Sequence, residues 1–414
     1  MRSNYRNIGD FIELVDVRNK GLQVTNLVGL SITKQFIKSV ANTIGTDMEN
    51  YKIIQKNQFA CSIMQVRRDK KMPLALYTDY SPAIISQAYP IFEITKEAEL
   101  LPEYLMMWFT RSEFDRHACF LAVGGVRGSL EWEDFLEMEL PVPSIEKQRE
   151  IVKEYNTIVD RIKLNEQLNK KLEEAAQAVY KHWFVDFEFP NENGQPYKSF
   201  GGELTYNEEL DQDIPQGWKA SVLGEIIESH SKKHDFEKEE LIFFNTSDIL
   251  NGDFLHSNYS KVIKMPGQAK KSIRKNDILY SEIRPANKRF ALVRINSEDY
   301  VVSTKLMVLR LISSVVCHLR IYQFLTYPKF INELHQAAEG RSGTFPQITF
   351  EEHIENHPIV IASDNIEKKF KIFLEATYYQ FFSRRDENKA LKEIRKIILM
   401  RMSKVETLQT EQAI

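Results

Sequence analysis

Lysine and arginine side chains gather at two places in the chain, where they can neutralise an anionic ligand. The stronger cluster extends from 261 to 289 and has nine basic residues against two acids, a charge of +7 in a chain that sums to −3. In the weaker cluster, at 67–71, one acid opposes four basic residues. One basic run is more often a solvated loop, but two runs favour anion binding. The basic residues are Lys261, Lys264, Lys270, Lys271, Arg274, Lys275, Arg284, Lys288 and Arg289, and Arg67, Arg68, Lys70 and Lys71.

Arg284 and Pro285 follow a predicted strand at 278–283 inside the stronger cluster. An arginine there can donate two hydrogen bonds to O6 and N7 of guanine in the major groove. Contacts to phosphate position a protein on a duplex without specifying a sequence. We expect such phosphate contacts from Lys270, Lys271, Lys288 and Arg289.

Two glycine-rich loops, 124–129 and 340–344, offer arginine and hydroxyl groups on a backbone that can approach a ligand closely. These loops can read base edges or hold phosphate. The alternative is a pair of connecting loops whose glycines only supply turn geometry. The candidate DNA-binding side chains here are Arg127 and Ser129 in the first loop, and Arg341, Ser342 and Thr344 in the second.

Motifs for catalysis are absent from the sequence. It has no G-x-x-x-x-G-K-[ST] phosphate loop, no G-x-G-x-x-G, no G-x-S-x-G and no Pro-Pro pair of the kind found in amino-methyltransferase sites. The histidine pairs His230/His234 and His353/His357 lack the H-E-x-x-H pattern, which favours surface histidines over a metal site. We therefore predict no catalytic residue and no metal ligand in this chain.

The chain repeats its features in the same order, with an offset near 215 to 219 residues. A repeat this long is not a short solenoid unit. It predicts two domain-plus-helix halves in a pseudo-two-fold molecule, which suits a partner with two similar half-sites. The matched features are 56–60 with 275–279, Ser86 with Ser303, 104–114 with 320–330, 124–129 with 340–344, and Pro141 with Pro358.

The pattern of elements predicts an α+β protein. A first globular domain covers 1–143, with strands at 59–66, 74–77 and 83–94 and a helix at 100–120; prolines 141 and 143 end it. A linker rich in Pro, Gly, Asn and acid follows the first helix at 190–217. The second domain covers 218–360, with strands at 241–244, 278–283, 289–294 and 301–311 and a helix at 318–330.

Long helices follow each domain, at 144–189 and 361–414. Apolar residues recur at spacings of three and four, which predicts one buried stripe on each helix and a coiled coil. About 40 helical residues span roughly 60 Å. Asn165 and Asn169 interrupt the first stripe, where polar residues can fix the register. The predicted seam contains Ile151, Ile158, Ile162, Leu172, Val179, Trp183, Phe370, Phe373, Leu391 and Ile398.

Three segments together resemble the specificity subunits of type I restriction–modification systems. They are LPVPSIEKQREIV at 140–152, HWFVDF at 182–187 and IPQGW at 214–218. The second copy of the first segment, 357–364, departs from the family because it lacks the Glu-x-Gln-Arg ending.

The resemblance implies a non-catalytic reader of double-stranded DNA. Two target recognition domains would each bind half of a bipartite site, and two antiparallel helices would separate them. Methyltransferase (modification) subunits, two of them, would dock on the helices and methylate adenine; restriction/translocase subunits would cut. S-adenosylmethionine, ATP and Mg would then be bound by these partners, and no cofactor by this chain.

Composition leaves other functions open. With 414 residues, two or three domains are expected. Three distant cysteines, no apolar signal region and no apolar run of about 18 residues indicate a cytoplasmic protein without membrane contact. One alternative is a coiled-coil structural or interaction protein with no DNA role. Another, a self-contained nuclease or methyltransferase, is disfavoured by the absent motifs.

Overall fold

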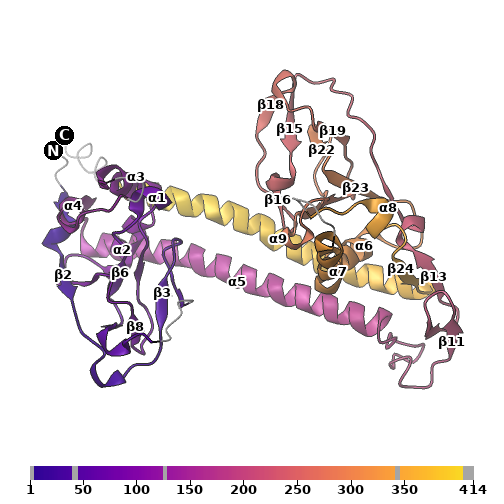
Figure 1. The fold of residues 1–414 in the computed structure, drawn as a ribbon, viewed down its shortest axis with the longest axis horizontal. Helices are drawn as coiled ribbons and strands as arrows, with labels where there is room; N and C mark the ends of the chain where they lie inside the picture. Colours follow the sequence, from indigo (N-terminus) through magenta and orange to yellow (C-terminus); the bar gives the residue numbers. More distant parts are fainter. Residues whose placement is uncertain (1–3, 40–44, 125–127, 341–345, 404–414) are drawn as a thin grey trace. The chain divides into compact units, whose positions relative to one another are not determined.

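The computed structural model describes residues 4–39, 45–124, 128–340 and 346–403. The chain divides into two units, one made of 1–166 and 386–414 and the other of 167–385. Each unit combines a globular domain with parts of two long helices, α5 (Ile145–Phe184) and α9 (Asp364–Arg401) (Figure 1). Within the described ranges, no helix combines the length and apolar character that a membrane span needs.

The first unit is built around an antiparallel four-stranded sheet in the order β2-β9-β6-β7. Helices α2 (Pro102–Phe109) and α3 (Ser112–Leu121) pack their aromatic side chains against it, so that Phe59 and Phe92 contact Phe109. The strands are β2 (Ile12–Val15), β9 (Ile91–Ile94), β6 (Phe59–Cys61) and β7 (Leu74–Leu76); smaller pairs are β1 (Tyr5–Asn7) with β10 (Glu139–Pro141), β3 (Val28–Leu30) with β4 (Phe36–Lys38), and β5 (Lys52–Ile54) with β8 (Ala83–Ile85).

The second unit repeats this sheet in the order β14-β23-β20-β21. Its strands are β14 (Ile227–Ser229), β23 (Leu306–Leu311), β20 (Ile278–Ser281) and β21 (Phe290–Leu292), followed by α6 (His318–Leu325), α7 (Pro328–Glu339) and the short α8 (Phe350–His353). A second four-stranded sheet has the order β18 (Tyr259–Lys261), β15 (Glu240–Phe244), β22 (Tyr300–Ser303) and β19 (Ala269–Ser272). Strand β13 (Lys219–Val222) pairs with β24 (Pro358–Ile361). The matching sheet orders confirm the predicted repeat.

Backbone details also recur at the predicted offset. Asn57 and Asn276, which precede β6 and β20, both have a left-handed backbone, with φ of 68° and 71°. The Ser86 hydroxyl accepts a hydrogen bond from the amide two residues later, and Ser303 does the same. Asparagine tolerates positive φ better than most residues, which explains its presence at both turns.

Several predicted elements are shorter or divided in the structure. The helices expected at 100–120 and 318–330 are each two helices, because the chain turns at Thr110–Arg111 and at Thr326–Tyr327. The runs 83–94 and 301–311 each form two strands, β8 and β9, and β22 and β23. The expected linker contains a hairpin of β11 (Leu204–Asn207) and β12 (Gln212–Pro215).

Helix α5 begins after Ser144, whose hydroxyl accepts a hydrogen bond from the amide of Lys147. The helix ends at Phe184, five residues before the predicted limit of 189. Phe187 has a φ of 59°, and its ring packs on Trp218. Tertiary packing therefore ends the helix, although no glycine or proline marks the place in the sequence.

The two long helices pair antiparallel inside each unit. In the first unit Ile151 shares a hydrophobic cluster with Ile398, and Asn165 bonds to Asn388. In the second unit the Phe184 ring contacts Phe370, and the Asn169 amide donates to the Phe381 carbonyl. Of the predicted seam, Ile151, Ile162, Phe370 and Ile398 are buried, and Ile158, Leu172, Val179, Trp183, Phe373 and Leu391 are partly buried.

Candidate nucleic-acid interface

The weaker basic cluster forms one tight turn between β6 and β7. Its centre is the short helix α1 (Val66–Asp69), with the left-handed residues Gln65 (φ 64°) and Lys70 (φ 52°) at its two ends. All four basic side chains of this turn are exposed, and Arg68 pairs with Asp69 at 2.6 Å. We call residues 65–71 the first basic turn.

The second unit has a similar turn between β20 and β21. A 3₁₀ turn at Pro285–Asn287 lies between left-handed Arg284 (φ 47°) and Lys288 (φ 52°). The side chains of Arg284 and Lys288 are exposed. We call residues 284–288 the second basic turn; in both turns a short helical turn lies between two left-handed residues, with four residues in the first and three in the second, and the side chains differ.

A second strand-like segment lies beside each basic turn. In the first unit the Leu130 amide donates to the Ile63 carbonyl at 2.9 Å, and the Arg67 amide donates to Gly128 at 3.3 Å. In the second unit the Ile348 amide donates to the Glu282 carbonyl at 2.8 Å, and the Arg284 amide donates to Pro346 at 3.1 Å. The segments that follow both glycine-rich loops are therefore part of the same surfaces as the basic turns.

Gly128 must be a glycine for a steric reason. A Cβ atom there would lie 2.7 Å from Cβ of Arg67. Ser129 is partly buried, and its backbone pairs with Val123. Four other predicted contacts, Arg127, Arg341, Ser342 and Thr344, lie outside the described residues.

The structure divides the stronger basic cluster between two ends of one strand. Arg274 and Lys275 precede β20, whereas Arg284 and Lys288 follow it. Lys270 is exposed on β19. A strand advances about 3.3 Å per residue, so these groups cannot all face one small ligand.

Two predicted phosphate contacts already bond to the protein backbone. The Arg289 guanidinium donates to the carbonyls of Ser247 and Ile249 at 2.8 and 3.0 Å. The Lys271 ammonium donates to the Leu306 carbonyl at 3.0 Å, and burial lowers its pKa. Both side chains therefore help to hold the second domain together.

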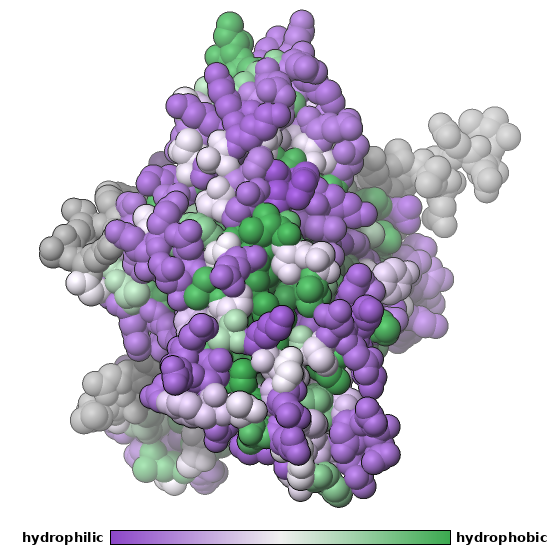
Figure 2. Space-filling view, turned by 90° about the vertical axis from the view of Figure 1, so that its right-hand side faces the viewer, coloured by the Kyte–Doolittle hydropathy of each residue, from purple (hydrophilic) through white to green (hydrophobic). Residues whose placement is uncertain are grey.

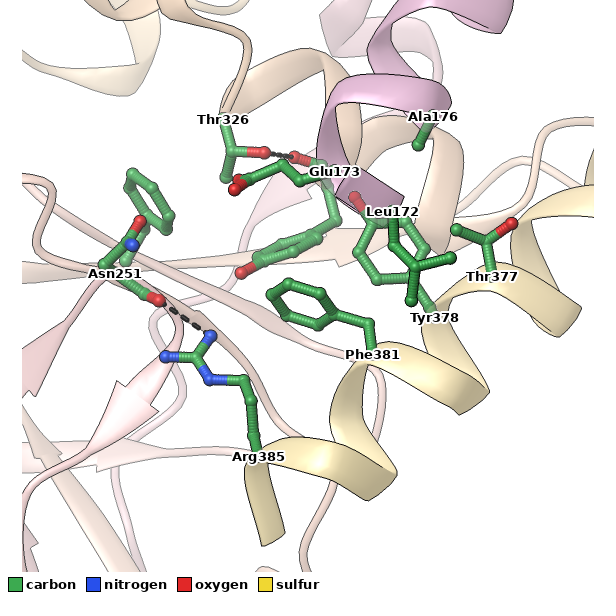
Figure 3. A pocket seen from close by; sticks show the side chains of 11 residues that line it. Leu172, Glu173, Ala176, Asn251, Thr326, Thr377, Tyr378, Phe381 and Arg385 are labelled. Carbon is green, nitrogen blue, oxygen red and sulfur yellow. Dashed lines mark hydrogen bonds between the residues drawn. The ribbon is translucent and has the colours of Figure 1, made fainter. Parts of the chain in front are cut away.

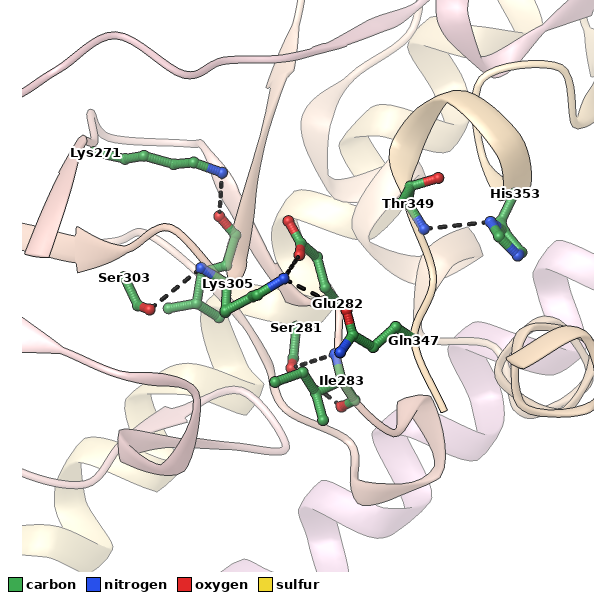
Figure 4. Close-up of polar contacts among 10 residues, drawn as sticks. Lys271, Ser281, Glu282, Ile283, Ser303, Lys305, Gln347, Thr349 and His353 are labelled. Atoms are coloured by element: carbon green, nitrogen blue, oxygen red, sulfur yellow. Dashed lines mark hydrogen bonds and ion pairs between the residues drawn. The ribbon is translucent and has the colours of Figure 1, made fainter. Parts of the chain in front are cut away.

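A polar network beside the second basic turn was not predicted from the sequence. The Lys305 ammonium lies 3.1 Å from a carboxylate oxygen of Glu282 and 3.4 Å from the side-chain oxygen of Gln347 (Figure 4). All three side chains are partly exposed. They come from three distant segments, so no local pattern could have revealed them.

The first unit has different chemistry at the same three places. Backbone hydrogen bonds and the repeat offset match Glu282 with Ile63, Lys305 with Ala88, and Gln347 with Ser129. The second surface thus offers a carboxylate, an ammonium and an amide, where the first offers two apolar groups and a hydroxyl. Two such surfaces cannot favour the same ligand groups.

The face drawn in Figure 2 is mostly hydrophilic, with a smaller group of hydrophobic side chains near its centre. In the described part of the chain, no three His, Cys, Asp or Glu side chains lie close enough to hold a metal ion.

Specificity subunits of type I restriction enzymes are similar to this chain in sequence. The type I restriction enzyme HindI specificity subunit of Haemophilus influenzae is 45% identical over 135 residues, which are 32% of this chain and 29% of that protein. The MjaIX specificity subunit of Methanocaldococcus jannaschii is 26% identical over 317 residues, 73% of this chain and 68% of that protein. The first match therefore spans less than a third of the relative's length.

A solved structure shares the fold. The crystal structure of the type I restriction-modification system S subunit from M. genitalium aligns with a TM-score of 0.57 and 13% identity, over 96% of this chain and 95% of that one. The family model of the type I restriction modification DNA specificity domain matches twice, at residues 4–174 and 215–393, once for each repeat. Since these matches cover most of the sequence, the chain belongs to the family of type I restriction modification DNA specificity domains.

Proposed function

We propose that this chain is the DNA sequence-specificity subunit of a type I restriction–modification complex. It recognises a bipartite site in double-stranded DNA and directs adenine methylation and cleavage by partner subunits. The observation that carries the proposal is the pair of basic turns, which have the same left-handed residues at their two ends and different neighbouring side chains. Similar scaffolds with different chemistry suit two half-sites of different sequence.

Each basic turn supplies charge, and its neighbours supply discrimination. Exposed cations at a turn neutralise phosphate and set the orientation of the domain. Arg284 can pair with guanine, and the Gln347 amide matches the N6 and N7 groups of adenine. The proposed DNA contacts are Arg67, Arg68, Lys70, Lys71, Arg127 and Ser129 in the first domain, and Lys270, Arg284, Lys288, Arg341, Ser342, Thr344, Glu282, Lys305 and Gln347 in the second; Lys271 and Arg289 add positive potential from their places in the domain.

Partners supply the chemistry in this proposal. Two methyltransferase subunits dock on the long helices, and restriction/translocase subunits join them. S-adenosylmethionine, ATP and Mg are bound by those subunits, and the complex acts in the cytoplasm. The functional boundaries are target recognition domains at 1–143 and 218–360, spacer helices at 144–189 and 361–414, and a linker at 190–217.

The first experiment defines the target. The chain is co-expressed with the methyltransferase encoded beside it, and adenine methylation is mapped with and without the chain. A bipartite methylated motif that disappears with the chain establishes the proposal. If methylation does not depend on the chain and no partner co-purifies, the coiled-coil alternative is favoured instead.

The second experiment compares Arg284→Ala with Lys275→Ala, an exposed cation at the opposite end of β20. Fluorescence anisotropy measures binding to the target and to duplexes with one half-site scrambled, at several salt concentrations. Arg284→Ala should cost ~1–3 kcal/mol on the target and little on a duplex whose second half-site is scrambled. An equal loss on both duplexes would reduce Arg284 to a phosphate contact, with a smaller salt slope.

A further inference from the structure

The tip of a small hairpin forms hydrogen bonds with the backbone at the end of the second basic turn. Strands β16 (Ile249–Leu250) and β17 (Asp253–Phe254) are joined by Asn251 and Gly252, both with positive φ. The two amides at this tip donate hydrogen bonds of 2.7 Å to the carbonyls of Lys288 and Phe290, respectively. The hairpin tip therefore fixes the backbone where the turn ends and β21 begins.

Arg385, on the part of α9 that belongs to the second unit, holds the same tip from its other side. Its guanidinium donates to the Asn251 carbonyl at 2.9 Å (Figure 3). It also forms an ion pair with the Asp253 carboxylate. The Arg385 side chain is only 16% exposed. Hydrogen bonds to a charged group are stronger than neutral ones, and partial burial limits their screening by salt.

Close packing leaves the tip little freedom. Tyr322, Tyr378 and Phe381 line the contact, and the remaining cavity is about 20 Å³. At Gly252, where φ is +87°, a Cβ atom would lie 2.7 Å from the Tyr322 hydroxyl and 2.9 Å from an Arg385 nitrogen. The contact is therefore closely packed, so a small displacement of α9 would move the tip.

The first unit secures its basic turn in another way. Lys34 lies 217 residues before Asn251, the offset of the repeat, at the tip between β3 and β4. Its ammonium donates to the Met72 carbonyl at 3.1 Å and to Asp115 at 2.8 Å, and Asp115 accepts from the Met72 amide at 3.2 Å. This clamp is made by groups of the globular domain itself.

Helix α5 faces the first clamp across open space. Lys34 lines a cleft of about 680 Å³, and Tyr155, Asn156 and Lys163 of α5 line the same cleft. In the second unit the corresponding contact between tip and helix is closed by Arg385 and aromatic rings. The two repeats therefore differ in how their basic turns are connected to the long helices.

We infer that Arg385 is a positioning residue that ties the second basic turn to helix α9, and so sets how the second half-site is read. The inference rests on the proposed function, because it assigns DNA reading to the turn. The path has two links: Arg385 holds the hairpin tip, and the tip holds the carbonyls of Lys288 and Phe290.

The test uses the full chain in complex with its methyltransferase subunits. Arg385→Met removes both polar contacts and retains an unbranched apolar side chain. Arg385→Lys keeps the charge but reaches one partner at a time, because an ammonium lacks the planar fork of a guanidinium. Arg384→Met is the matched control, since Arg384 donates to the Gln380 carbonyl of its own helix.

Two measurements are made on each variant. Amide hydrogen exchange reports the tip (249–254) and the second basic turn, and anisotropy reports discrimination between the mapped target and duplexes with either half-site scrambled. With Arg385→Met, exchange at both segments should rise roughly 10- to 100-fold, as expected for loss of hydrogen bonds to a charged group. Discrimination at the second half-site should fall, while discrimination at the first stays unchanged. Arg385→Lys should restore part of both effects, and Arg384→Met should change neither.

The outcomes separate this inference from the proposed function. Unchanged exchange at the second basic turn in Arg385→Met would overturn the mechanical link. Faster exchange with unchanged discrimination would confirm the link and overturn the assignment of DNA reading to this turn. Equal loss of discrimination at both half-sites would overturn the claim that Arg385 acts on the second site alone.

Discussion

Asp277 and Arg310 form a two-bond ion pair inside the second unit, with nitrogen–oxygen distances of 2.9 and 2.8 Å. The first unit has Gln58 and Glu93 at the matching positions, joined by one bond of 2.8 Å. Asp277 also accepts the amide three residues before it, and Gln58 does the same. The repeat has therefore kept a partly buried side-chain bridge between the central strands and changed the charges that form it.

Because the two units use different side chains at these positions, substitution can test whether the two bridges are equivalent. Arg310→Met should lower the free energy of unfolding by ~3–5 kcal/mol, because the buried Asp277 carboxylate loses its two-bond partner and keeps only the longer contact to Arg274, at 3.7 Å. The double variant Asp277→Gln with Arg310→Glu copies the pair of the first unit and should recover much of that loss. Urea denaturation of the three proteins measures both effects. A double variant no more stable than Arg310→Met would show that the sites are not equivalent.

The paired asparagines in the helix seam should lower the stability of the protein while fixing the register of α5 against α9. The Asn165 amide donates to the Asn388 side chain at 2.9 Å inside the seam. Asn388→Leu alone should cost ~1–3 kcal/mol, because a buried polar group loses a partner. Leucine at both positions should recover that stability or exceed it. Thermal unfolding tests this, with the exposed Gln167→Leu as control; additive losses in the double variant would contradict it.

The clamp of the first basic turn depends on one buried ion pair. The side chains of Lys34 and Asp115 are 7% and 11% exposed, and burial lowers the pKa of Lys34. Lys34→Met should destabilise the first unit by ~3–5 kcal/mol, because the buried Asp115 carboxylate loses its ammonium partner. Lys38→Met, on the exposed part of the same hairpin, is the control for lysine removal in calorimetry. Equal melting temperatures for the two variants would show that the pair does not stabilise the unit.

The second unit should lose stability in mild acid. Burial lowers the pKa of His318, and that of His230 and His234. A histidine with a lowered pKa in the folded state binds fewer protons than in the unfolded chain. Its contribution to stability is therefore complete above the unfolded pKa of about 6.5 and declines as pH falls below it.

His318→Asn isolates one part of this pH dependence. The variant should show a shallower fall of melting temperature between roughly pH 7 and pH 5 than the natural chain. His256→Asn, at a half-buried histidine of the same unit, provides the comparison. If the curves of His318→Asn and the natural chain are parallel, His318 does not contribute.

Local sequence patterns gave much of the fold. The apolar stripes predicted both long helices, and prolines 141 and 143 come just before the first of them. Matched short segments, such as those beginning at Lys56 and Lys275, predicted the repeat that the matching sheet orders confirm. These features depend on neighbours within a few residues, so a single sequence contains them.

Long-range contacts set the ends of several elements. The helix end at Phe184 depends on aromatic packing around Trp218, which is far along the chain. The strand predicted at 59–66 ends at Cys61, because the chain turns into the first basic turn. Periodicity cannot report such endings, since the same apolar residues continue through them.

By itself, the sequence determined that the chain has two related halves, two long helices, two basic segments and the motifs of its family. Tertiary structure alone decided which cations share a surface. It separated Lys275 from Arg284 by the length of β20, used Arg289 to bind carbonyls, and placed Lys305 and Gln347 beside the second basic turn. The physical reason is that strand pairing and loops bring together segments that are tens of residues apart in the chain. A sequence pattern records only the charge and polarity of each residue.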